Sequence, residues 1–179
     1  RAHSIDEALE LLSEWGEDGC LLAGGTDLMA QYGRGEIAPG ALIHIEGIEQ
    51  LSIISSGTRT QIGALTSHRE LAADAEIAAG HPALASAAGL VGGWQTQAAG
   101  SLGGNICNAS PAADLAPPLL VADAHVTLTS KSGERRLALN EFFMDRRATA
   151  RRPDELLTVI GLEPLPPGSA ECYLKLGRR

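Results

Sequence analysis

Two short glycine-containing segments hold the residues whose types and spacing could do chemistry. The first reads LLAGGTDL (residues 21–28) and the second reads SLGGNICNAS (residues 101–110). Adjacent glycines carry no Cβ, so a ligand can come close to the backbone, and consecutive amides before a helix favour an anion. Hydroxyl and amide side chains in the same segments could add hydrogen bonds: Thr26, Ser101, Asn105 and Asn108. The two segments could therefore hold a pyrophosphate between them.

The residues alone leave other interpretations of these segments open. Neither segment matches GxGxxG or GxxxxGK[ST], so neither a Rossmann nor a P-loop site is indicated. Asp27 carries the wrong charge for a phosphate, and we expect it to cap a helix or to contact a ligand hydroxyl. In a chain with 21 glycines, both segments could also serve only as turns.

The elements expected around the first segment form a small α/β unit. Ser4 and Glu7 have the spacing of a capping box, and apolar residues recur at helical spacing up to Trp15. The expected elements of this unit are a helix from Ser4 to Gly16, a strand at Cys20–Ala23, a helix from Thr26 to Tyr32 and a strand at Ala41–Ile45. They occupy roughly residues 1–50.

The second part of the chain favours an antiparallel sheet with helices. The expected strands are 51–55 and 60–64, which read as a hairpin, followed by 124–129, 135–139, 156–162 and 170–176. The expected helices are 66–73, 82–91 and 114–121, and the second glycine segment is expected to be a loop. The fold class predicted is α+β, with two subdomains.

Composition and charge exclude several function classes. The net charge of −8 argues against nucleic acid as a partner, and no apolar run approaches the ~20 residues of a membrane span. The four arginines of the segment 146–152 are expected in a solvated loop or a subunit contact. The three widely spaced cysteines favour free thiols in a reducing compartment, hence a cytoplasmic protein.

No catalytic or metal-binding constellation is evident. The five histidines are dispersed without an HExxH or paired spacing, and each is expected to be a surface or packed residue. Ser110 lacks the GxSxG context of a nucleophile. We therefore expect no catalytic residue and no metal ligand on this chain.

Five segments resemble the FAD-binding domain of molybdenum hydroxylases. They are residues 22–28, 62–66, 101–114, 152–158 and 173–179, and they cover nearly the whole chain in order. That family includes the medium subunits of aerobic carbon monoxide dehydrogenases and the FAD domain of xanthine dehydrogenases. The resemblance implies a PCMH-type domain of the vanillyl-alcohol-oxidase fold over residues 1–179, with subdomains at about 1–50 and 51–179.

The resemblance also implies the cofactor and its site. FAD would lie between the two subdomains, and the family's following C-terminal domain would lie beyond Arg179. The positions that the resemblance assigns to cofactor binding are Leu22, Ala23, Gly24, Gly25, Thr26, Asp27, Leu28, Ser101, Gly103, Gly104, Asn105, Asn108, Asp114, Leu157 and Lys175. The glycine segments would hold the diphosphate, Asp114 an FAD hydroxyl, and Leu157 and Lys175 the flavin.

The function implied is electron transfer. A partner subunit with the molybdenum cofactor would oxidise substrate, a small subunit would pass electrons through [2Fe–2S] clusters, and FAD on this chain would deliver them to an external acceptor. Two alternatives remain at this point. One is an FAD-dependent oxidase that acts on substrate directly at the flavin, and the other is a non-enzymatic interaction domain.

Overall fold

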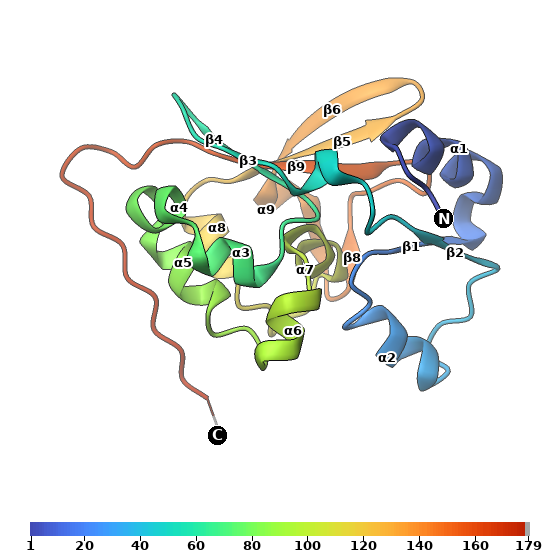
Figure 1. The fold of residues 1–179 in the computed structure, drawn as a ribbon, viewed down its shortest axis with the longest axis horizontal. Coiled ribbons are helices and arrows are strands. Elements are labelled where there is room, and N and C mark those ends of the chain that lie inside the picture. Colours follow the sequence, from blue (N-terminus) through green and yellow to red (C-terminus); the bar gives the residue numbers. More distant parts are fainter. Residues whose placement is uncertain (178–179) are drawn as a thin grey trace.

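The computed structural model describes residues 1–177 and arranges them in two lobes (Figure 1). Arg178 and Arg179, the last residues of the resemblance, lie outside the described residues. The N-terminal lobe contains α1 (Ile5–Trp15), η1 (Gly16–Asp18), β1 (Gly19–Leu22), α2 (Leu28–Gly33), β2 (Ala41–His44) and η2 (Glu49–Ser52). Its two strands pair in parallel. The structure confirms the helix, strand, helix and strand expected for this α/β unit, in the expected order.

Helix α1 begins where the sequence predicted. The Oγ of Ser4 accepts a hydrogen bond from the Glu7 amide at 3.1 Å. The reciprocal bond differs from a capping box, because the Glu7 carboxylate accepts from the His3 amide at 2.7 Å and not from that of Ser4. Both acidic residues of the first turn, Asp6 and Glu7, also complement the helix dipole.

The second lobe is built on one antiparallel sheet of five strands. In spatial order these are β3 (Ile54–Ser55), β4 (Thr60–Gly63), β9 (Leu156–Leu162), β5 (His125–Ser130) and β6 (Gly133–Ala138). Strand β9 is central, and of its seven residues only Val159 is not buried. The predicted strands 124–129, 135–139 and 156–162 are confirmed to within a few residues.

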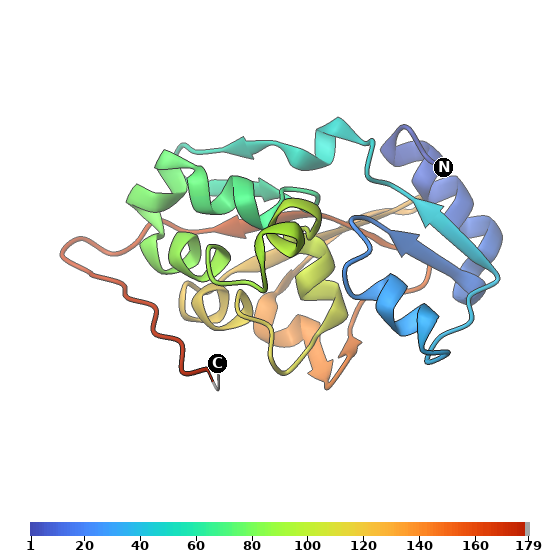
Figure 2. The ribbon, with the colours of Figure 1, turned by 60° about the horizontal axis from the view of Figure 1, so that its bottom comes forward.

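Helices pack on one side of this sheet (Figures 1 and 2). They are α3 (His68–Ala73), α4 (Ala75–Gly80), α5 (Pro82–Ala88), α6 (Trp94–Ala99), α7 (Leu102–Asn108), α8 (Ala116–Val121) and α9 (Leu139–Phe142). A short hairpin of β7 (Phe143–Asp145) and β8 (Ala148–Thr149) follows. The expected helices 66–73, 82–91 and 114–121 correspond to α3, α5 and α8.

Each lobe has its own hydrophobic cluster. The larger cluster joins sheet residues such as Ile62 and Ile160 to helix residues such as Leu71 and Ile106. The smaller cluster joins Leu12 of α1 to the β2 region and includes Leu156 of β9. The subdomain boundary near residue 50 stays a prediction, since one residue of β9 completes the N-terminal cluster.

The expected hairpin is confirmed as the antiparallel pair β3–β4, but the strand expected at 51–55 is shorter, because Leu51 and Ser52 belong to η2. Two further expected elements are wrong. The second glycine segment is not a loop, because Ser101 caps α7 and places both glycines in its first turn. The segment 170–176 is not a strand, and among the described residues beyond β9 there is no helix or strand. That segment pairs with neither edge of the sheet, and it is held by side-chain contacts, including one between Glu171 and the Ala83 amide at 3.3 Å.

Candidate functional site

A cavity of about 670 Å³ lies between the N-terminal lobe and the helices that precede β5. Such a volume suits a cofactor-sized ligand. Twelve of the fifteen predicted site residues line it, from both glycine segments and β9: Ala23, Gly24, Gly25, Thr26, Asp27, Leu28, Ser101, Gly103, Gly104, Asn105, Asn108 and Leu157. The fold therefore brings the two segments to one place, although they lie far apart in sequence.

The first glycine segment lines this cavity and contains unpaired amides. Within residues 1–177, the backbone amides of residues 24–27 donate no hydrogen bond. Gly25 has φ +67°, a left-handed conformation that L-residues rarely adopt. Successive unpaired amides around such a residue form a concave site for an anion. Asp27 occupies the N-cap position of α2, but its side chain makes no capping bond.

Gly24 serves a different purpose from Gly25. A Cβ built on Gly24 would lie 1.5 Å from the Ala99 carbonyl oxygen. Only glycine lets the backbone of the first segment pass this close to the end of α6. Gly24 therefore sets the contact between the lobes, whereas Gly25 sets the turn that exposes the amides.

The second segment differs from the prediction, since its amides are already bonded. The Gly103 amide donates to the Ala64 carbonyl at 2.7 Å, and the Gly104 amide donates to Ser101 Oγ at 3.2 Å. A Cβ on Gly103 would lie 2.7 Å from the Ala64 Cβ, so this glycine permits close packing of α7 against the sheet. Exposed amides at this segment are thus not found, and a cofactor contact by Gly103 or Gly104 stays a prediction.

The two asparagines of α7 have different surroundings. Asn105 Oδ1 is buried and has no hydrogen-bond partner among the described residues. Asn108 Oδ1 accepts from Gln31 Nε2 at 3.0 Å and from Arg147 Nη1 at 2.9 Å. Asn108 therefore links α2 of the N-terminal lobe to the β7–β8 hairpin of the second lobe, and Asn105 is available to a ligand.

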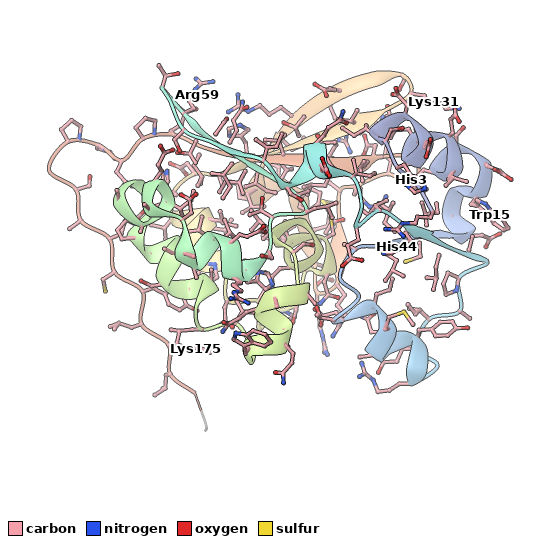
Figure 3. The ribbon with its side chains drawn as sticks, viewed as in Figure 1. His3, Trp15, His44, Arg59, Lys131 and Lys175 are labelled. Atoms are coloured by element: carbon pink, nitrogen blue, oxygen red, sulfur yellow. The ribbon has the colours of Figure 1, made fainter. Side chains whose placement is uncertain are left out.

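Three predicted site residues lie outside the cavity lining. Leu22 is in β1, where its carbonyl accepts from the Ile45 amide at 2.9 Å. Asp114 binds Lys175 Nζ at 2.8 Å and the Tyr173 hydroxyl at 3.0 Å. In Figure 3 the labelled Lys175 lies on the C-terminal segment, well away from α2. Direct contacts of these three residues with a cofactor remain predictions.

The cavity is also lined by residues that sequence reasoning missed. Arg147 and Arg151 line it; Arg147 is exposed in a turn, as the expected solvated loop requires, and the alternative of a subunit contact stays a prediction. His68, expected only as a packed or surface residue, is 3% exposed and lines the cavity as well. No local spacing reveals these residues, because many separate parts of the chain supply the wall.

Burial keeps the thiols near the cavity in their protonated form. Burial raises the pKa of Cys107 to about 11, although the positive charge of Arg151 acts in the opposite direction. Burial also raises the pKa of Cys20, again opposed by Arg151. The thiolate is the nucleophilic form of cysteine, so neither side chain has the character of a reactive nucleophile.

A two-lobed α+β fold with unpaired amides in the wall of an interlobe cavity suits a nucleotide cofactor. Residues 1–164 match the family described as the FAD binding domain in molybdopterin dehydrogenase, and the chain belongs to that family. FAD as the cofactor, expected from the resemblance, is thereby confirmed. The unpaired amides of residues 24–27 fit a cofactor that carries a diphosphate, and the partnerless Asn105 Oδ1 fits a hydroxyl or N–H group of such a cofactor.

Several relatives share this domain. The chain is 33% identical over 179 residues to the 6-hydroxypseudooxynicotine dehydrogenase complex subunit alpha of Paenarthrobacter nicotinovorans, covering 99% of this chain and 60% of that protein. It is 32% identical over 180 residues to the carbon monoxide dehydrogenase medium chain of Afipia carboxidovorans, covering 100% and 62%. It thus spans about three fifths of the length of these relatives.

Solved structures agree with the expected fold. A carbon monoxide dehydrogenase from Hydrogenophaga pseudoflava matches with a TM-score of 0.95 and 31% identity, covering 99% of this chain and 62% of that one. The predicted α+β fold of the family is therefore confirmed. Over the described part of the chain, no helix has the length and apolar character needed to cross a membrane.

Proposed function

We propose that this chain holds FAD in the interlobe cavity, with the diphosphate against the amides of residues 24–27. The observation that carries the proposal is this set of unpaired amides on the wall of a cavity that both lobes form. Thr26 and Ser101 add hydroxyls at the same cavity, and Leu157 of β9 adds an apolar surface suited to a ring system. Arg147 and Arg151 add positive charge that favours an anionic ligand.

We further propose that the chain is the electron-transfer component of a molybdenum-containing dehydrogenase. Its relatives are named as subunits of dehydrogenases for carbon monoxide and for 6-hydroxypseudooxynicotine. Bound FAD supplies the ability to take up and release electrons, while the protein orients it and excludes water. Partner subunits would carry the molybdenum cofactor and [2Fe–2S] clusters, and an external acceptor would receive the electrons.

A cytoplasmic location is part of this proposal. It is supported by the three cysteines, all of which are free thiols. Free thiols are usual in a reducing compartment. Fractionation of cells that produce the protein, followed by detection with an antibody, tests the location, and recovery outside the cytoplasm would contradict it.

Cofactor choice tests the site. FAD and ADP both contain a diphosphate, whereas FMN does not. Titration of the purified full-length protein should show tight binding of FAD, competition by ADP and no measurable binding of FMN. Equal binding of FAD and FMN would contradict the placement of the diphosphate, and absence of flavin binding would overturn the proposed function.

A pair of glycine variants makes the test specific. Gly25 and Gly35 have similar φ values, +67° and +69°, but only Gly25 lines the cavity. Gly25→Ala should weaken FAD binding about tenfold or more, because it disturbs amides that bond a charged group. Gly35→Ala carries similar backbone strain and should leave FAD affinity unchanged.

The electron-transfer role has its own experiment. The tagged protein, purified from the cells that naturally make it, should bring down partner subunits with molybdenum and iron in the same complex. Metal analysis of the eluate measures both elements. Recovery of the flavoprotein without either metal would contradict the role as a subunit, and it would leave FAD binding itself intact.

A further inference from the structure

His68 stands in the wall of the cavity at the start of α3. Ser67 caps that helix, and its carboxylate partner Glu70 completes a capping box. The His68 amide donates to the Gly100 carbonyl at 3.1 Å, which fixes its backbone against the residue before the second glycine segment. The position of His68 relative to α7 is therefore set by two independent backbone features.

The imidazole of His68 fits closely beside Gly100. A Cβ on Gly100 would lie 2.9 Å from His68 Nε2, so any side chain at residue 100 would compete with the ring for space. The residue is only 3% exposed, and yet it lines the cavity. The ring is thus held in one place by its neighbours, as a residue that positions a ligand must be.

The ring has no hydrogen-bond partner within residues 1–177. Its Nδ1 is buried without a partner, and Nε2 forms no hydrogen bond either. Buried polar atoms in folded proteins are nearly always bonded, and exceptions gather at functional sites. Nε2, unlike Nδ1, is not fully buried, so a ligand in the cavity would supply a partner to Nε2 and would leave Nδ1 without one.

The charge state of the ring follows from its surroundings. Burial lowers the pKa of His68 to about 4, while the carboxylates of Asp27 and Asp114 oppose this shift. The imidazole is therefore neutral at physiological pH, with one N–H donor and one acceptor. A buried donor without a partner is rarer in proteins than a buried acceptor without one, which favours the acceptor at Nδ1 and the proton on Nε2.

We propose that His68 is a further cofactor-binding residue, whose neutral imidazole donates a hydrogen bond from Nε2 to an acceptor atom of FAD. The inference rests on the proposed function, because it takes FAD as the ligand. It adds a side-chain donor from α3 to a site that otherwise depends on the first glycine segment and α7. A side chain at Gly100 would meet both the Thr96 carbonyl oxygen, at 2.7 Å from its Cβ, and the His68 ring, so the glycine leaves room for both.

Three variants test the proposal in the full-length protein. His68→Phe keeps a ring of similar size without the donor and should weaken FAD binding about threefold to tenfold, the effect of one lost hydrogen bond. His68→Gln places an amide nitrogen near the position of Nε2 and should recover most of the affinity. His81→Phe is the matched control, because His81 is also buried with a partnerless Nδ1 but does not line the cavity.

The readout is the dissociation constant for FAD, measured by titration calorimetry. Wild-type affinity in His68→Phe, or an equal loss in His81→Phe, would overturn the inference while the proposed function stands. Failure of the wild-type protein to bind FAD would overturn both together.

A second measurement guards against a variant that does not fold. In the wild-type protein labelled with ¹⁵N-histidine, FAD should shift the ring nitrogen signals of His68 and should leave those of His81 in place. A His68 ring that does not respond to saturating FAD would also overturn the inference.

Discussion

Lys175 Nζ binds Asp114 Oδ2 at 2.8 Å, and this contact joins residues 61 positions apart in the chain. The Tyr173 hydroxyl donates a second hydrogen bond to the same carboxylate. Burial, together with this bond to Asp114, raises the pKa of Tyr173 to about 12. Asp114 lies between α7 and α8, directly after the second glycine segment. Two hydrogen bonds therefore hold the C-terminal segment to the loop after α7, the helix that contains the second glycine segment.

The Asp114–Lys175 pair should contribute modestly to stability. The Lys175 side chain is 37% exposed, so solvent screens the pair, and we expect a coupling of about 0.2–1 kcal/mol. A double-mutant cycle with Asp114→Asn and Lys175→Met, followed by urea unfolding, measures this coupling. Strictly additive effects of the two substitutions would contradict an interaction between them.

The adjacent glycines of α7 should respond differently to substitution. Gly103→Ala places a Cβ 2.7 Å from the Ala64 Cβ and 2.8 Å from its carbonyl oxygen, and it should lower the free energy of unfolding by about 1–3 kcal/mol. Gly104→Ala meets only the Ser101 hydroxyl, at 2.9 Å, and should cost less stability, because a hydroxyl can shift more easily than the Ala64 backbone. Urea unfolding compares the two variants, and equal losses would contradict the packing described for α7.

Gly24→Ala should disturb the contact between the lobes. Its Cβ would overlap the Ala99 carbonyl, so the backbone of one lobe must move, and we expect a loss of at least about 2 kcal/mol. Gly33→Ala is the control, because a Cβ there meets nothing within 4 Å. Thermal unfolding measures both variants. A Gly24→Ala protein as stable as the wild type would show that the lobes tolerate a shift.

The stability of the protein should fall in mild acid through His68. Its folded-state pKa of about 4 lies below the ordinary value of 6.5, so the unfolded chain binds the proton first. Stability is therefore unaffected above about pH 6.5 and declines as pH falls toward 4, by up to about 3 kcal/mol. Burial lowers the pKa of His81 in the same direction.

Urea unfolding of wild type and His68→Phe at several pH values isolates this contribution. The variant should lose less stability than the wild type between pH 6.5 and 4, since it has no imidazole to protonate at this position. Parallel curves for the two proteins would contradict a buried neutral His68.

Local signals predicted some elements and could not predict others. Helix α1 follows from Ser4 and from apolar residues at helical spacing, which are properties of one short segment. Helix α7 was missed because Gly103-Gly104 has low helix propensity, and its stabilisation comes from the Ser101 cap together with contacts to Ala64, which lies far away in sequence. The segment 170–176 alternates like a strand, but a strand requires a partner that local pattern does not reveal.

Residue types in the sequence predicted one part of the candidate site and could not predict another. The first glycine segment and its unpaired amides were predictable from residue types, because glycine permits the positive φ that Gly25 adopts. The side of the wall formed by His68, Arg147 and Arg151 comes from segments with no shared spacing. Tertiary structure alone brings them to the cavity.

Leu156 and Leu157 are neighbours on β9, yet they belong to different hydrophobic clusters. Successive side chains of a strand point to opposite faces, so one strand inserts a leucine into each lobe. Two adjacent leucines of β9 thus connect the hydrophobic clusters of the two lobes at the wall of the cavity. A fragment that ends at residue 50 would lack Leu156 and would leave Leu12 and Ile43 partly uncovered. A large movement of one lobe away from the other would disrupt the packing of Leu156 or of Leu157, so such a movement is disfavoured.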